Sequence, residues 1–159
     1  MKTLLTCVLL LAFNCASAQK GTISWNDLER LTAMDLAAFE KEMERMGFSP
    51  DTKSNKNTTE CATLGYLGEV TANGDRNKAA TTRCSDGMRT VSYYTTSEAD
   101  ITKMKDAATA SGFKLKPGPG TASDAGAYTR DGKQMRTDRS VANGVSYYTI
   151  SYSGSWPLK

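Results

Sequence analysis

The chain offers few side chains that could carry out catalysis. It contains no histidine, the side chain that most often moves protons near neutral pH, so a triad of the serine–histidine type is excluded. A hydrolase would need carboxylates or a lysine-activated serine, and the acidic candidates are Asp86, Asp131 and Asp138. Turn chemistry explains the positions of these aspartates. We therefore expect a protein that is not an enzyme, and keep a histidine-free hydrolase as an alternative.

Two cysteines have the spacing of a cross-strand disulfide. A hairpin whose turn is centred near residues 72 and 73 brings Cys61 and Cys84 almost opposite one another, where a non-hydrogen-bonded pair allows a bond. Two thiols without a histidine would leave structural zinc short of ligands. We expect a Cys61–Cys84 disulfide and no metal or other cofactor.

A third group of side chains is suited to binding. The pentapeptide Val-Ser-Tyr-Tyr-Thr occurs at residues 91–95 and again at 145–149. Successive side chains of a strand point to opposite faces, and valine with the first tyrosine is the natural core face. The side chains expected on the other, open face are Tyr94, Tyr148 and Tyr152, with Arg89, Arg136, Arg83 or Arg139 nearby. The alternative interpretation is that these tyrosines only cover structure, because tyrosine is a good strand former.

Helix signals precede each group of strands. Ser24 is the expected N-cap of a short helix over residues 24–31, and Thr32 with Asp35 predicts the start of a second helix that ends at Gly47. Ser97 with Asp100 predicts a third helix that ends at Gly112.

Strand and turn signals fill the remaining chain. Alternating apolar and β-branched residues predict strands at residues 60–70, 78–84, 89–96, 125–130, 133–138 and 145–152. Tight turns are expected at 72–75, 86–87, 131–132 and 143–144. Polar composition predicts loops at 49–59 and 114–120.

The helix signals recur at one offset. Thr32 and Ser97, Leu36 and Ile101, and Gly47 and Gly112 are each 65 residues apart. We therefore predict two tandem α-β-β-β repeats, at about 32–96 and about 97–153. The expected fold class is α+β: up to six antiparallel strands form one sheet, with helices packed on one face and the opposite face open.

The first residues resemble a secretory signal. Lys2, an apolar run from Leu4 to Phe13 and the small-residue site Ala16-Ser17-Ala18 predict a signal peptide at 1–18 and a single exported domain at 19–159. Lipidation of Cys15 stays open as an alternative, although Ala12 and Asn14 do not fit a lipobox. The apolar run is too short to span a bilayer, and no later stretch is apolar enough. We expect a periplasmic or secreted protein.

This plan resembles two families of small exported proteins. A tandem helix-plus-antiparallel-sheet repeat with an aromatic-rich open face is similar to the beta-lactamase-inhibitor-protein-like architecture, and also to PepSY-like domains. The resemblance covers residues 19–159 in plan but rests on no family-specific motif, and the second copy lacks a disulfide. It implies inhibition of another protein.

The partner expected from these features is another exported or envelope protein. Tyrosine and arginine are side chains that protein interfaces favour. Loss of Lys2 with the signal lowers the formal net charge from +3 to +2, and the charges are interspersed, so nucleic acid is not an expected partner. The leading hypothesis is a non-catalytic binding module, such as an inhibitor or immunity-type protein. The alternative is a small-ligand-binding envelope protein, which a cavity between sheet and helices would indicate.

Overall fold

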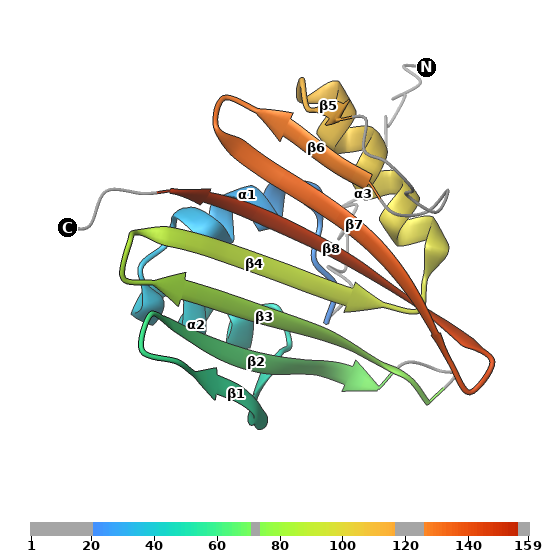
Figure 1. Cartoon of the computed structure of the whole chain (residues 1–159). Coiled ribbons are helices and arrows are strands. Elements are labelled where there is room, and N and C mark those ends of the chain that lie inside the picture. Colours follow the sequence, from blue (N-terminus) through green and yellow to red (C-terminus); the bar gives the residue numbers. More distant parts are fainter. Residues whose placement is uncertain (1–20, 71–73, 117–125, 156–159) are drawn as a thin grey trace, which may run out of the picture.

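The computed structural model describes residues 21–70, 74–116 and 126–155. In these ranges the chain forms three helices and eight strands (Figure 1). In chain order the elements are α1 (Trp25–Ala33), α2 (Leu36–Arg45), β1 (Ser49–Asn57), β2 (Cys61–Val70), β3 (Arg76–Cys84), β4 (Met88–Thr95), α3 (Glu98–Ala110), β5 (Lys114–Lys116), β6 (Gly126–Arg130), β7 (Lys133–Ala142) and β8 (Val145–Ser155). The predicted α+β class is confirmed.

All eight strands belong to one curled antiparallel sheet. Its order is β1-β2-β3-β4-β8-β7-β6-β5, so two four-stranded meanders meet where β4 pairs with β8. The prediction of at most six strands is wrong, because the expected loops at 49–59 and 114–120 contain the edge strands β1 and β5. These strands are almost entirely exposed and polar, so neither shows the apolar alternation by which a strand is recognised.

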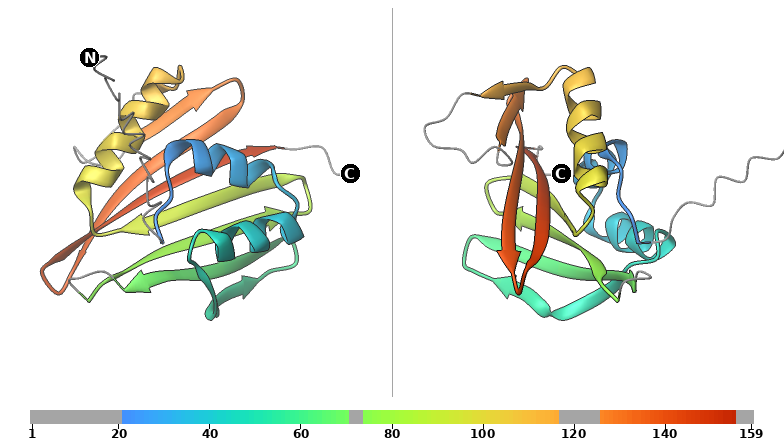
Figure 2. Two further views of the ribbon diagram at one scale, coloured as in Figure 1. Left: turned by 180° about the vertical axis from the view of Figure 1, so that it is seen from behind. Right: turned by 90° about the vertical axis from the view of Figure 1, so that its right-hand side faces the viewer.

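The three helices pack on one face of the sheet, and no other element of the described residues covers the opposite face, which we call the open face (Figure 2). Helix α1 contacts β4 and β8 at the centre of the sheet, and α3 contacts the same two strands. Trp25 of α1 packs edge-on against Phe113 and Tyr152, with ring centroids 5.1 Å and 5.4 Å away. The core therefore lies between the helices and the central strands.

The helix caps agree with the sequence in two cases out of three. The side chains of Ser24 and Ser97 accept hydrogen bonds from the backbone N–H groups of Asp27 and Asp100, as expected. The expected cap at Thr32 is wrong. Thr32 is buried within α1 and its hydroxyl donates to the carbonyl of Leu28, while Asp35 caps α2. The apolar stripe of α1 continues through Leu31, so the helix runs on past the expected boundary.

The expected disulfide and several turns are confirmed. Cys61 and Cys84 pair across β2 and β3 with their Cα atoms 4.0 Å apart, and their sulfurs are bonded. Asp131-Gly132 and Asn143-Gly144 both have positive φ at each residue, the backbone that a two-residue hairpin turn requires. The first part of the turn expected at 72–75 lies outside the described residues.

None of the helices in the described part of the chain combines the length and apolar composition that a membrane crossing requires.

Candidate functional site

The two copies of the pentapeptide bury different tyrosines beneath the helices: the first tyrosine in β4 and the second in β8. In β4, Val91 and Tyr93 are fully buried and Tyr94 is 38% exposed. In β8 the order is reversed, since Tyr148 is 7% exposed and Tyr147 is 40% exposed. Tyr93 pairs with Ile150 across the two strands, and directly paired residues of an antiparallel sheet share a face. The register therefore places Tyr148 beneath the helices.

The expectation that Tyr148 and Tyr152 lie on the open face is wrong. The hydroxyl of Tyr148 donates a hydrogen bond to Glu98 of α3 over 3.1 Å. Tyr152 is 1% exposed, and its hydroxyl donates to Glu29 of α1 over 3.2 Å. Burial and the negative charge of Glu29 raise the pKa of Tyr152 to about 12. Both tyrosines join the helices to the sheet.

Sequence reasoning missed Tyr147, the exposed tyrosine of β8. The signal was present along the whole strand, because Tyr148, Ile150 and Tyr152 alternate with Thr149 and Ser151. Three large side chains against small polar ones identify the core face. The expectation for β8 followed the five residues that it shares with β4, although the alternation along the rest of β8 indicates the opposite face.

Three of the four expected arginines also lie on the helix face. Arg83 and Arg89 donate hydrogen bonds to the carbonyl of Met34, over 2.9 Å and 3.1 Å. Met34 is the C-cap of α1, where cations stabilise the free carbonyls at the negative end of the helix dipole. Burial, followed by repulsion from Arg89, lowers the pKa of Arg83. These arginines are bound to α1, so Arg89 is not available on the open face as expected.

The guanidinium of Arg139 lies 5.7 Å from the ring centre of Tyr148, and it donates to the Ser146 hydroxyl. Its strand partner is Tyr148, which places it on the helix side of β7. Of the four expected arginines, Arg136 is the one that lies on the open face, because its partner in β8 is Ser151.

Tyr94 and Arg136 meet at a hollow in the open face. The hollow has a volume of about 520 Å³ and is lined by Tyr94, Ala127, Arg136, Asp138, Thr149 and Ser151, together with Gly126 and Thr137. Tyr94 is opposite Thr149, which is opposite Asp138, so these three residues form one wall. Arg136 lies between Ser151 and Ala127 in the next row. The two small neighbours leave space around the guanidinium.

Paired hydroxyl groups cover the centre of the open face. Thr63 and Thr82 lie 2.9 Å apart, Thr90 and Ser153 are also 2.9 Å apart, and Ser92 and Ser151 are 2.8 Å apart. Each pair joins directly opposed residues of neighbouring strands. Because these side chains are short and bond one another, they extend less far from the sheet than the longer side chains on the same face.

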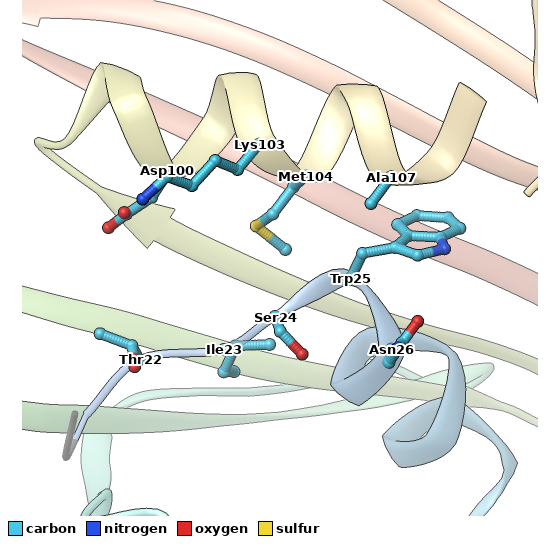
Figure 3. A pocket seen from close by; sticks show the side chains of 9 residues that line it. All are labelled: Thr22, Ile23, Ser24, Trp25, Asn26, Asp100, Lys103, Met104 and Ala107. Carbon is cyan, nitrogen blue, oxygen red and sulfur yellow. The ribbon is translucent and has the colours of Figure 1, made fainter. Parts of the chain in front are cut away.

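A second hollow of about 340 Å³ lies between α3 and the stretch that leads into α1 (Figure 3). Trp25 and Met104 approach one another across it, while Asp100 and Lys103 project from α3. Its three large apolar lining residues, Ile23, Trp25 and Met104, are at most 4% exposed. A small ligand would therefore touch mainly the edges of buried side chains.

The described residues include no group of three cysteines and carboxylates that could hold a metal ion. Asp86, Asp131 and Asp138 are spread over three places: Asp86 accepts a hydrogen bond from the backbone of Met88, Asp131 lies in the β6–β7 turn, and Asp138 lies on the wall of the open-face hollow. The structure does not bring these carboxylates together.

Comparison with known proteins finds no match for this chain, whether among protein-family models, curated proteins or solved structures.

Proposed function

We propose that this protein is a non-catalytic, exported binding module that engages another exported or envelope protein with the open face of its sheet. One observation carries the proposal: most of the exposed large apolar side chains in the described part of the chain lie on the face that no helix covers. Five of the eight large apolar side chains exposed in the described part of the chain lie on this face by strand register, namely Val70, Met88, Tyr94, Val145 and Tyr147.

The exposed tyrosines form the centre of the proposed interface. Tyr94 is opposite Thr149, and Tyr147 lies two residues away on the same face of β8. The two tyrosines are therefore diagonal neighbours, whose backbone positions are typically about 7–8 Å apart. Tyrosine supplies a large contact area at low entropic cost and keeps a polar hydroxyl for the rim. A patch of this composition on an uncovered face is typical of a protein-binding surface.

Two further observations support the export of the protein and its inhibitor-like or immunity-type role. The Cys61–Cys84 disulfide favours an oxidising compartment, in agreement with a signal peptide at 1–18. A helix followed by four strands occurs twice in the order of elements, which favours an internal repeat and the plan of beta-lactamase-inhibitor-protein-like or PepSY-like proteins. An inhibitor or immunity-type role fits this plan.

The test is a pull-down from envelope and secreted fractions with tagged protein, read by mass spectrometry. We expect wild-type protein to retain one partner that a Tyr94→Ala plus Tyr147→Ala variant loses by about tenfold or more, because interface tyrosines are often hot spots. The matched control is Leu115→Ala plus Val141→Ala, which removes two side chains that are 60% and 63% exposed but lie away from the open face. Equal retention by a folded tyrosine variant would refute the proposal.

The hollow beside Trp25 and Met104 favours a second candidate function, binding of a small ligand. If neither the wild type nor the control retains a protein, the ligand function becomes the better explanation. Lys103→Ala and Ala107→Leu, which alter the lining of this hollow, would then identify the site.

A further inference from the structure

We infer that the partner presents an acidic segment to the open face, and that one of its carboxylates enters the hollow beside Tyr94 and pairs with Arg136. The inference rests on the proposed function and adds the chemistry of the partner to it.

Arg136 is placed and available for such a pair. It lines the hollow together with Tyr94, Thr149 and Ser151. Its side chain is exposed, and it forms neither a hydrogen bond nor an ion pair within residues 21–70, 74–116 and 126–155. Asp138 lies two residues away on the same face and accepts a hydrogen bond from the backbone of Arg139. The guanidinium therefore keeps its donors for a ligand, and a planar guanidinium matches a carboxylate with two parallel hydrogen bonds.

Cationic side chains outnumber carboxylates on the open face around the hollow. Strand register places six cationic side chains on the open face: Lys56, Arg76, Lys78, Lys114, Lys116 and Arg136. The carboxylates placed there by direct pairing are Asp51 and Asp138, and Asp51 already bonds the Ser54 hydroxyl. None of the six cations forms an ion pair with a described residue.

The helix side differs from this pattern. Its ion pairs join Arg30, Arg45 and Arg130 to Asp27, Glu42 and Glu29, so charges of both signs are matched there. The unmatched cations of the open face would attract an acidic surface and orient it during association.

A protein fits this face better than a polyanion does. The cations share the open face with exposed apolar side chains, including Met88, Tyr94 and Tyr147, which phosphate groups cannot cover. The whole chain carries a formal net charge of only +3, whereas nucleic-acid-binding domains are usually strongly basic. Apolar side chains beside carboxylates are the composition of an acidic protein segment.

The experiment selects random peptides, displayed on phage, against the immobilised full chain. We expect the selected peptides to be enriched in Asp and Glu together with apolar residues, relative to the starting library. One enriched peptide is then synthesised, and its affinity is measured against Arg136→Gln. Loss of the guanidinium should weaken binding by about tenfold, since a charge-assisted hydrogen bond to a carboxylate is lost, and added salt should weaken wild-type binding.

Control variants separate this inference from the proposed function. Lys41→Gln plus Lys105→Gln removes two cations from α2 and α3 and should leave peptide affinity unchanged. Loss of binding in the Tyr94→Ala plus Tyr147→Ala variant, but not in Arg136→Gln, would retain the open face as the binding surface and overturn the carboxylate pair. Selected peptides without acidic enrichment would also overturn the inference. So would Arg136-dependent binding of phosphatidylglycerol vesicles without such enrichment, which would point to a membrane surface.

Discussion

At the scale of single residues, the hydroxyl groups of Tyr148 and Tyr152 hold two helices against the sheet. Tyr148 donates to Glu98 at the start of α3, and Tyr152 donates to Glu29 in the middle of α1. Glu29 also pairs with Arg130 over 2.7 Å, and the Arg130 guanidinium lies 4.7 Å from the ring centre of Phe113. Each tyrosine thus combines a buried ring with a satisfied polar group, and removing it would leave a cavity and take one hydrogen bond from a helix glutamate.

Tyr148→Ala should therefore destabilise the protein far more than Tyr94→Ala, although both change the fourth residue of the same pentapeptide. Truncating a buried aromatic ring costs about 3–5 kcal/mol, whereas an exposed side chain away from the core costs about 0.5 kcal/mol. Urea unfolding of the two variants measures the difference. Equal loss of unfolding free energy would mean that β8 does not present Tyr148 to the core.

The third position of the pentapeptide provides the matched control. Tyr93→Ala should be as damaging as Tyr148→Ala, because Tyr93 is fully buried, while Tyr147→Ala should resemble Tyr94→Ala. The two strands should therefore show opposite sensitivities at the third and fourth positions.

At the scale of elements, Glu42 joins α1 to α2. Its carboxylate lies 2.6 Å from the guanidinium of Arg30 in α1 and 2.6 Å from that of Arg45 in its own helix. The hydrogen bonds from Arg45 and then from Arg30 lower the pKa of Glu42 to about 2, against the opposing effect of burial. The ionised carboxylate is therefore more favourable in the folded chain than in the unfolded chain.

A carboxyl whose folded pKa is depressed stabilises the fold at a pH above its unfolded pKa of 4.5, and this contribution is lost as the pH falls toward about 2. We expect wild-type protein to lose more unfolding free energy than Glu42→Gln between about pH 6 and about pH 3, where the native carboxylate begins to lose this advantage. The difference should be about 1 kcal/mol or less, because the Arg45 partner is largely exposed.

Urea unfolding at both pH values makes the measurement. Glu44→Gln is the control, since Glu44 lies on the same helix and its carboxylate pairs with no described residue. The same pH dependence in Glu42→Gln and the wild type would show that the Arg30–Glu42 bridge does not connect the helices in solution.

At the scale of the whole molecule, the Cys61–Cys84 disulfide and the β4–β8 pairing connect different parts of the sheet. The disulfide closes a sequence separation of 23 residues within the β2–β3 hairpin. The β4–β8 pairing instead joins residues that are 53 to 67 positions apart in sequence, such as Val91 with Tyr152 and Tyr93 with Ile150. The first connection is local and covalent, and the second depends on burial beneath the helices.

Cys61→Ser plus Cys84→Ser should lower the free energy of unfolding by about 3 kcal/mol, because the unfolded chain gains the freedom of an open loop of this size. Urea unfolding with and without reductant measures this loss. Reductant should lower the stability of the wild type to that of the double variant and leave the double variant unchanged. An effect of reductant on both proteins alike would assign the change to another cause.

Local chemistry in the sequence determined several features that the structure confirms. The Ser24 and Ser97 caps, the Asp131-Gly132 and Asn143-Gly144 turns, and the Cys61–Cys84 pair each depend on residues that are close in sequence or in one hairpin. The α+β class and the exposed position of Tyr94 follow from periodicity within single elements. These features required no knowledge of distant contacts.

Only the tertiary structure decided which face of β8 is buried and which polar segments become strands. Alternation along β8 shows which side chains share a face, but not which of the two faces is buried. The register of β4 and β8 places Tyr148 opposite Thr95, and the helices cover the face on which both residues lie. In the same way, β1 becomes a strand because β2 offers it free backbone groups, and Arg89 turns inward because the carbonyls at the end of α1 lie there. In each case the partner is distant in sequence, so the free energy that selects the conformation appears only when the chain has folded.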